Sequence, residues 1–241
     1  CVAMDSKTAT FRHELFKEYK AQRDKTPQDL QAQIPVIEAI LEKAGVQTLR
    51  VDGYEADDVI ATIARRCDGE GLSCLIVSND KDLLQLVDDD GDITALRYEK
   101  QQYVRYTARD VSGHFDVKPE QIIDYLAIVG DSSDNIPGIP GIGAKGAAKL
   151  LSTYEDLETL YAHREELTPA NRKKIEAGID TARTSKELVT LKIIDELNPD
   201  RAGSEISTLD WSRAVEDFSR IGARSLVELA GGDSTEVFSR N

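Results

Sequence analysis

Acidic residues recur in this chain at the points where short apolar runs end and helical patterns begin. Asp5 follows the first such run, the segment GYEADD follows a run at 46–52, and the segment SNDKD follows a run at 72–77. Ligands of open parallel sheets bind outside the carboxyl ends of the strands, so we expect the three acidic groups to share one edge of a sheet. The residues concerned are Asp5, Glu55, Asp57, Asp58, Asp80 and Asp82.

The order of the expected elements predicts an α/β fold. Strands alternate with helices over residues 1–87, which is typical of a mostly parallel sheet with helices on its faces. Two β-like runs within 92–106 predict a hairpin. From residue 107 onward the pattern is helical, with helices expected at 119–128, 141–151, 168–192 and 210–230. This change predicts two domains, an α/β core at 1–116 and a helical region at 117–241.

One helix of the α/β part shows clear start and stop signals. Thr26 offers an N-cap, and Pro27 would occupy the first helical position. Apolar residues then recur at spacings of four and three up to Gly45, which predicts an amphipathic helix. This stripe consists of Leu30, Ile34, Ile37, Leu41 and Ala44.

A fourth acidic pair, Asp131 and Asp134, lies in the helical part of the chain, in the segment GDSSDN. Crowding so many carboxylates is costly because like charges repel, and a bound cation removes that cost. Oxygen ligands without His or Cys favour Mg²⁺ or Mn²⁺ over zinc, and a cluster large enough for two ions suggests phosphodiester chemistry. Spacing alone leaves an alternative equally open, in which these residues are helix caps and solvated turns.

The glycine-rich segment GIPGIGAKG at 138–146 predicts a tight connection between two helices. Its glycine spacing matches a dinucleotide-binding motif, but Pro137 and Pro140 exclude the strand that must precede such a motif. In a helix-hairpin-helix, glycines let the backbone approach a phosphate, and the second helix presents free N–H groups. Lys145 and Lys149 add positive charge, so the hairpin is expected to bind a nucleic-acid backbone without reading its sequence. An ordinary tight turn is the alternative.

The segment FRHELFKEYKAQR at 11–23 interleaves basic and aromatic residues. Aromatic side chains stack on unpaired bases while Lys and Arg follow the phosphates. The alternative is a solvated amphipathic helix. Because the segment directly follows Asp5, we expect it to lie over the metal site.

Composition restricts the class of protein further. The net charge of −14 argues against a nucleic-acid binder when taken alone, but a local basic stripe can exist within an acidic total. No stretch is long and apolar enough for a membrane span, and no signal peptide is present. Three cysteines without a CxxC pair fit a reducing cytosol better than a disulfide scaffold or a zinc site. We therefore expect a cytoplasmic protein without a membrane partner.

In their order and spacing, four segments resemble the 5′-nuclease (5′–3′ exonuclease and flap endonuclease) domain of bacterial DNA polymerase I. They are MDSKTATFRHELFKEYKAQR, GYEADD, SNDKDLLQL and GDSSDNIPGIPGIGAKGAAKLL, and the resemblance covers essentially the whole chain. It implies a PIN-like nuclease core followed by a helix-hairpin-helix region. It also implies an enzyme that hydrolyses DNA at 5′ ends and 5′ flaps in replication and repair, including primer removal. We expect a monomer, and the resemblance leaves open whether a polymerase domain is covalently linked beyond residue 241.

The resemblance also implies roles for individual residues. The first metal group would comprise Asp5, Glu55, Asp57 and Asp58, and the second Asp80, Asp82, Asp131 and Asp134. Tyr19, Lys20 and Arg23 match the base of a helical arch for a single-stranded 5′ end. Lys20 and Arg23 would also stabilise negative charge on the phosphate during hydrolysis assisted by two ions. In the hairpin, relatives hold a monovalent cation such as K⁺ on backbone carbonyls. The expected DNA-binding residues are Arg12, Tyr19, Lys20, Arg23, Gly138, Ile139, Gly141, Gly143, Lys145 and Lys149.

One departure from the family concerns the start of the chain. The family begins with a further strand that carries an Asp, whereas this sequence starts at Cys1 and not at Met. We therefore expect a chain truncated at its N-terminus, with one ligand of the first metal group missing. The competing hypothesis is a structure-specific DNA-binding module that is inactive without that strand and its Asp.

Overall fold

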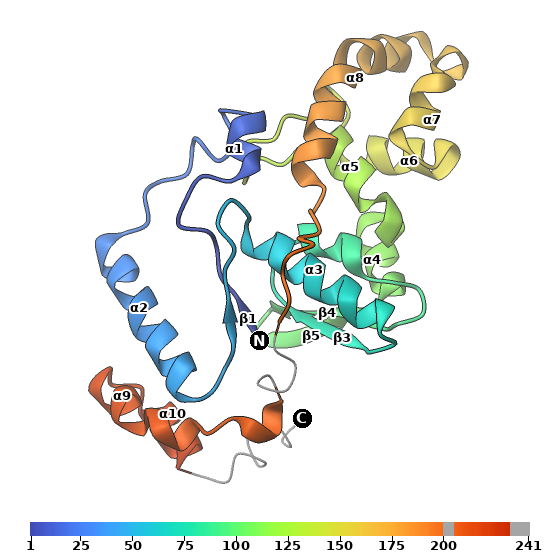
Figure 1. Cartoon of the computed structure of the whole chain (residues 1–241). Coiled ribbons are helices and arrows are strands. Elements are labelled where there is room, and N and C mark those ends of the chain that lie inside the picture. Colours follow the sequence, from blue (N-terminus) through green and yellow to red (C-terminus); the bar gives the residue numbers. More distant parts are fainter. Residues whose placement is uncertain (200–204, 232–241) are drawn as a thin grey trace. The chain divides into compact units, whose positions relative to one another are not determined.

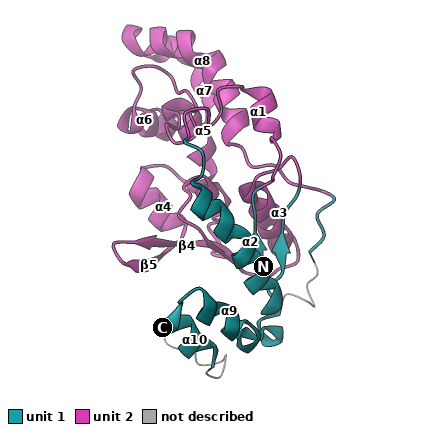
Figure 2. Cartoon of the chain, turned by 90° about the vertical axis from the view of Figure 1, so that its left-hand side faces the viewer, with its two compact units in different colours: residues 1–5, 24–51, 196–241 teal, residues 6–23, 52–195 magenta. Residues whose placement is uncertain are grey.

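The computed structural model describes residues 1–199 and 205–231. These residues form two compact units, each assembled from separate stretches of sequence (Figure 2). Unit 1 comprises residues 1–5, 24–51 and 196–241, and unit 2 comprises residues 6–23 and 52–195. The domain boundary predicted near residue 117 falls inside unit 2, and residues 200–204 and 232–241 of the predicted second domain lie outside the described part of the chain.

Unit 1 contains a short parallel strand pair and a small helical core. Strand β1 (Val2–Ala3) pairs in parallel with β2 (Thr48–Leu49). The helical core consists of buried residues from α2 (Gln28–Lys43), η6 (Trp211–Ala214), α9 (Val215–Arg220) and α10 (Arg224–Ala230). A 3₁₀ turn, η5 (Ile206–Thr208), precedes η6.

Helix α2 differs from its prediction in two respects. Its N-cap is Pro27, which has no side-chain acceptor, so the predicted Thr26 cap was wrong. The predicted stripe is largely exposed, with 47% of both Leu30 and Ile37 accessible, whereas Ile40 is buried against Phe218 and its neighbours. Only the C-terminal half of the helix meets the small core of unit 1, so Ile40 and the partly buried Val36 form the inward-facing line.

Unit 2 contains a three-stranded mixed sheet covered by α3 (Ala56–Gly69) (Figure 1). Strand β3 (Cys74–Val77) pairs in parallel with β4 (Ile93–Glu99), and β4 pairs antiparallel with β5 (Gln102–Tyr106). The predicted hairpin at 92–106 is thus confirmed. Its two turn residues, Lys100 and Gln101, have φ values of 48° and 66°, the left-handed conformation that a two-residue hairpin turn requires. The α/β class is confirmed, with a parallel pair in each sheet, but the described strands form two sheets and not one.

A helical layer forms the remainder of unit 2, and α8 (Pro169–Val189) lies beside α5 (Ile122–Val129) within it (Figure 1). Its largest core is built from aliphatic side chains such as Leu126, Leu151 and Ile175. Thr168 accepts a hydrogen bond from Asn171 N–H, and Pro169 occupies the first turn, which explains where α8 begins. The helical elements are α1 (Phe11–Leu15), η1 (Asp82–Leu86), α4 (Ala108–Phe115), η2 (Pro119–Gln121), α5 (Ile122–Val129), α6 (Ala144–Tyr154), α7 (Leu157–Ala162), η3 (Arg164–Glu166) and α8 (Pro169–Val189).

Helices α5 and α6 are joined by the glycine-rich loop, as predicted. Helix α5 ends at Gly130, whose φ of 80° is readily adopted only by glycine. Asp131 and Ile136 then form an antiparallel bridge through two backbone hydrogen bonds of 2.8 Å each. This bridge closes a small loop over residues 132–135, so Asp131 and Asp134 are presented from a fixed backbone. Across the described residues, we find no helix with the length and apolar character needed to span a membrane.

Candidate functional site

Three acidic side chains of unit 2 form a buried cluster. Asp82 lies at the start of η1, the next element after β3, while Asp131 and Asp134 lie in the loop after α5. Each of the three offers an oxygen within 4.8 Å of the others, and all three are buried. The structure therefore brings together three of the four residues predicted for the second metal group. Asp80 is exposed, and its Oδ1 accepts a hydrogen bond of 2.9 Å from Asp82 N–H.

The environment of Asp82 fits a divalent cation. Its Oδ1 is buried and has no hydrogen-bond partner among the described residues. Burial, followed by the charges of Asp80 and Asp131, raises the pKa of Asp82 to about 8. A cation at this position would stabilise the carboxylate, and an all-oxygen donor set suits Mg²⁺ or Mn²⁺.

Lys81 is a functional candidate that the sequence analysis missed. Its Nζ lies 2.8 Å from Asp131 Oδ2, and Ser133 N–H donates to Asp131 Oδ1 at 2.8 Å. Burial alone would raise the pKa of Asp131, but the hydrogen bonds from Lys81 and Ser133 lower it below its ordinary value. A signal was present in the sequence, since Lys81 is the basic residue inside the acidic motif SNDKD.

A second group of contacts links Glu55, at the N-terminus of α3, to Asp134. The hydroxyl of Tyr19 lies 2.9 Å from both Glu55 Oε2 and Asp134 Oδ2. Nζ of Lys20 lies 2.8 Å from Glu55 Oε1 and 3.5 Å from Asp134 Oδ2, and Arg23 pairs with Asp134 Oδ1. Burial and the two nearby carboxylates raise the pKa of Tyr19, so the phenol stays protonated. The segment predicted to lie over the metal site therefore contacts carboxylates from both predicted groups.

The other residues of the predicted first metal group have different surroundings. Asp57 is half-buried in the first turn of α3. Asp58 is fully buried, and both of its oxygens accept hydrogen bonds from Arg12. Asp5 belongs to unit 1, where its carbonyl accepts a hydrogen bond of 2.8 Å from Arg50 Nε. Their assignment as metal ligands stays a prediction.

Arg12 was predicted to bind DNA, but only 2% of its surface is exposed. Besides Asp58, it donates to the carbonyls of Leu188 at 2.7 Å and Thr190 at 3.3 Å. All three guanidinium nitrogens are thus used inside unit 2. A phosphate could reach Arg12 only if these contacts were broken.

In the hairpin, the predicted DNA-binding residues divide into buried and exposed positions. A Cβ on Gly138 would lie 2.3 Å from the carbonyl carbon of Val129, so this glycine is required for backbone packing. Ile139 is buried, and its N–H donates to Ile128 O at 2.7 Å. Gly141 and Gly143 are exposed, as are the side chains of Lys145 and Lys149 on α6. The exposed residues are the part of the hairpin that a phosphate could reach.

Side chains of helix α8 donate hydrogen bonds to backbone carbonyls of this hairpin, and the sequence analysis did not predict this contact. Lys174 Nζ donates to the carbonyl of Gly141 at 2.9 Å, and Ser185 Oγ donates to the carbonyl of Pro137. Gly178 lies between these two residues on α8, and a Cβ at this position would lie 2.8 Å from Ile139 Cγ2. An ammonium group of the chain itself therefore lies at a carbonyl of the hairpin, where the resemblance implied a K⁺ ion. A signal was present in the sequence, because Lys174, Gly178 and Ser185 are spaced by four and seven residues, which places them on one face of a helix.

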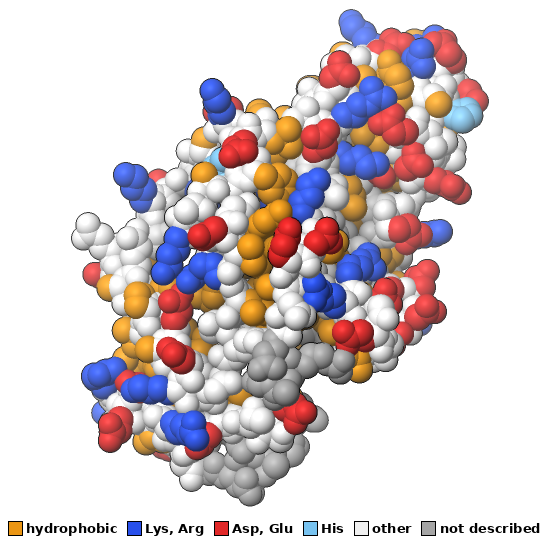
Figure 3. All heavy atoms as spheres, viewed as in Figure 1, with side chains coloured by type: hydrophobic (Ala, Val, Ile, Leu, Met, Phe, Trp, Pro, Cys, Tyr) orange, Lys and Arg blue, Asp and Glu red, His pale blue; other side chains and the backbone are white. Residues whose placement is uncertain are grey.

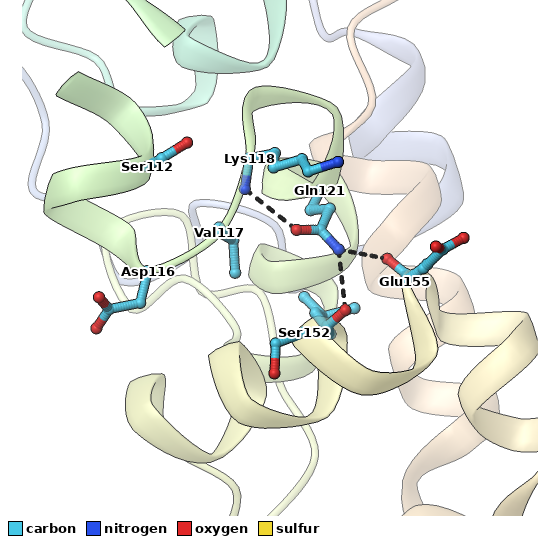
Figure 4. A pocket seen from close by; sticks show the side chains of 8 residues that line it. Ser112, Asp116, Val117, Lys118, Gln121, Ser152 and Glu155 are labelled. Atoms are coloured by element: carbon cyan, nitrogen blue, oxygen red, sulfur yellow. Dashed lines mark hydrogen bonds between the residues drawn. The ribbon is translucent and has the colours of Figure 1, made fainter. Parts of the chain in front are cut away.

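A shallow groove between α4, η2 and α6 lies elsewhere in unit 2 (Figure 4). Gln121 crosses it, donating to Leu151 O at 3.0 Å and Glu155 O at 2.8 Å, and it accepts from Lys118 N–H at 3.1 Å. Its amide is satisfied by these contacts, and none of the cluster carboxylates lines the groove. On the face shown in Figure 3, basic side chains are interspersed with acidic ones, so no continuous basic stripe crosses the described residues visible there.

The chain is similar to 5'-3' exonucleases along most of its length. Residues 1–116 match the family described as "5'-3' exonuclease, N-terminal resolvase-like domain", and residues 117–209 match "5'-3' exonuclease, C-terminal SAM fold". The chain is 34% identical to the 5'-3' exonuclease of Mycoplasma pneumoniae, covering 94% of this chain and 78% of the relative. It is 37% identical to DNA polymerase I of Bacillus subtilis and 45% identical to that of Treponema pallidum, covering 98% and 93% of this chain. The chain spans only 27% and 22% of the length of these two polymerases.

Two solved structures show the same fold at low sequence identity. T5 5'-exonuclease with bound zinc ions has a TM-score of 0.65 at 23% identity, covering 93% of this chain and 79% of that one. The catalytic core of Rad2 in complex with DNA has a TM-score of 0.54 at 14% identity, covering 92% and 75%. These similarities confirm the predicted PIN-like class.

Proposed function

The chain belongs to the 5'-3' exonuclease family, and from this membership we propose that it is a metal-dependent, structure-specific DNA 5′-nuclease. It hydrolyses phosphodiester bonds at 5′ ends and 5′ flaps, as primer removal in replication and repair requires. The observation that carries this proposal is the cluster of Asp82, Asp131 and Asp134, with Lys20 and Arg23 in contact with Asp134. The site thus places carboxylates, which attract metal ions, next to the side chains of Lys20 and Arg23, whose positive charges attract phosphate.

Two groups of residues would hold two Mg²⁺ or Mn²⁺ ions. When bound, these ions supply Lewis-acid assistance for hydrolysis of a phosphodiester. Asp82 Oδ1, which has no partner in the described part of the chain, supports the second group, and the remaining ligands are assigned by family membership. The first group predicted from the sequence is Asp5, Glu55, Asp57 and Asp58, and the second is Asp80, Asp82, Asp131 and Asp134.

Lys20 and Arg23 are the proposed catalytic residues, because a phosphate above the carboxylates would meet their ammonium and guanidinium groups. They bind the phosphate and stabilise the negative charge that develops on it during hydrolysis. Tyr19 holds the carboxylates of Glu55 and Asp134 in place, since its hydroxyl contacts both.

The hairpin would bind the duplex part of the substrate. The N-terminus of α6 at Gly143, together with Lys145 and Lys149, offers N–H groups and positive charge to a DNA backbone. A K⁺ ion on the hairpin carbonyls belongs to this proposal. The DNA-bound Rad2 core and the DNA polymerase I relatives support DNA as the partner and a linked polymerase domain as a further partner. We also propose a monomer acting in the cytoplasm.

A cleavage assay on a 5′-flap DNA with Mg²⁺ or Mn²⁺ tests the function. Asp82→Asn and Asp80→Asn should abolish product, while Asp89→Asn, a matched change in an exposed turn, should not. Unchanged cleavage by both site variants would show that the site is wrongly assigned. Flap binding that persists in EDTA, with no product in Mn²⁺, would identify the non-catalytic DNA-binding module.

A further inference from the structure

We propose that Arg12 and Asp58 form a buried clamp that positions the metal site, and that Asp58 is a positioning residue and not a metal ligand. This proposal rests on the metal-dependent function proposed above. It reassigns two residues, one that the sequence placed among the ligands and one that it placed against DNA.

Both oxygens of Asp58 are saturated by hydrogen bonds. Oδ2 accepts from Arg12 Nη1 at 2.7 Å and from Glu55 N–H at 3.0 Å. Oδ1 accepts from Arg12 Nη2 at 2.9 Å and from Lys192 N–H at 2.8 Å. Two oxygens of a carboxylate offer about four acceptor sites. All four are occupied, so a metal ion could bind Asp58 only by displacing a donor of the chain.

Displacement of Arg12 is especially unfavourable. Its guanidinium is buried with Asp58 as its bidentate partner, and a buried charge that loses its partner is strongly destabilising. Arg12 Nη1 also lies 3.6 Å from Glu55 Oε2, and the other contacts of Arg12, to the carbonyls of Leu188 and Thr190, carry no formal charge. Asp58 therefore has its counter-ion inside the protein.

Asp82 differs from Asp58 in the partners of its carboxylate. Both carboxylates are buried, but Oδ1 of Asp82 has no partner among the described residues, and its nearest charged neighbours include other carboxylates. A cation from solution would satisfy Asp82, whereas Arg12 already satisfies Asp58. The two side chains therefore have different roles within one acidic region.

The clamp joins three segments that meet at the site. Arg12 lies on α1, Asp58 lies in the first turn of α3, and the chain leaving α8 supplies Leu188 O, Thr190 O and Lys192 N–H. Asp58 also caps Glu55, whose carboxylate lies 3.6 Å from Arg12 Nη1 and contacts Lys20. By fixing α1 against α3, the clamp sets where Lys20 stands relative to Glu55.

Mn²⁺ titration of the purified chain, followed by electron paramagnetic resonance, tests this inference together with the melting temperature in EDTA. The variants are Asp58→Asn, the neutral pair Arg12→Gln/Asp58→Asn, and Asp82→Asn as the reference ligand change. The neutral pair keeps side-chain donors and acceptors and removes both buried charges. We expect it to bind as many Mn²⁺ ions as the parent with affinity within about threefold, and to melt above Asp58→Asn.

Asp82→Asn should instead lose at least tenfold in Mn²⁺ affinity at an unchanged fold. A folded neutral pair that loses an ion, or tenfold in affinity, would overturn the inference and make Asp58 a ligand. A neutral pair that melts no higher than Asp58→Asn would overturn the clamp. If the parent chain binds no Mn²⁺ at all, the proposed metal-dependent function is contradicted. The melting temperatures of Asp58→Asn and the neutral pair in EDTA still test the clamp in that case.

Discussion

The phenolic oxygen of Tyr19 lies 2.9 Å from Oδ2 of Asp134, although 115 residues separate the two in the sequence. The same hydroxyl lies 2.9 Å from Glu55 Oε2, so one neutral donor serves two buried carboxylates. We expect Tyr19→Phe to keep the buried ring in place and to reduce the free energy of unfolding by about 1–2 kcal/mol, because a buried acceptor loses its donor. Urea unfolding in EDTA would measure this loss, and an unchanged midpoint would contradict it.

Lys20 and Arg23 should contribute to cleavage more than to binding. Each contacts a carboxylate of the site, and each would meet the phosphate whose charge increases during hydrolysis. We expect Lys20→Ala and Arg23→Ala to lower kcat by roughly 100-fold with a smaller effect on KM. Lys17→Ala is the matched control, since this exposed lysine lies on the same segment. Equal losses in all three variants would indicate only a general charge effect.

Divalent metal should stabilise the folded chain through the cluster of Asp82, Asp131 and Asp134. A ligand present at 100 times its Kd adds about 2.7 kcal/mol, or roughly 5–10 °C in Tm for a chain of this size. We expect Mg²⁺ or Mn²⁺ to raise Tm and EDTA to reverse the rise. Differential scanning calorimetry would detect the shift, and its persistence in Asp82→Asn would argue against this cluster as the metal site.

Lys174 should strengthen DNA binding through the hairpin. Its ammonium lies against the carbonyl of Gly141, which places positive charge at the turn where a phosphate would bind. We expect Lys174→Ala to weaken flap binding and to reduce the slope of log K against log salt by about one. Lys173→Ala is the control, because the preceding residue points about 100° away around the helix. Identical salt slopes for the parent and Lys174→Ala would exclude a phosphate contact.

Gly178 should not tolerate alanine, although it lies within a helix. Alanine normally stabilises a helix interior by up to about 1 kcal/mol over glycine. At Gly178 the added Cβ would lie 2.8 Å from Ile139 Cγ2, so α8 and the hairpin would have to separate. We expect Gly178→Ala to lower Tm and weaken DNA binding. Gly113→Ala, in α4, should raise Tm, because no atom of the described residues lies within 4 Å of the added Cβ. Stabilisation by both substitutions would show that the hairpin does not pack as described.

Local patterns in the sequence were sufficient for the elements of unit 2 that have strong start and stop signals. The β4–β5 hairpin, the helix beginning at Pro169 and the two helices around the glycine-rich loop follow from alternation, capping residues and Gly/Pro placement. For helix α2, local patterns did not predict which face is buried. The residues Leu30 and Ile37 form a regular apolar stripe, yet they are exposed, because which face is buried depends on what packs against the helix.

The carboxylates show the same division between sequence and tertiary structure. The sequence by itself determined their number, their oxygen-only chemistry and their places after predicted strands and helices, since these are properties of residue type and spacing. Only the tertiary structure decided which of them lack a partner. Arg12 and Asp58 are 46 residues apart, and their pairing depends on α1 docking against α3. The same folding leaves Asp82 Oδ1 buried without a donor from any residue that the structure describes. Whether a carboxylate attracts a metal ion or stabilises the fold depends on its neighbours in space, which residue spacing does not specify.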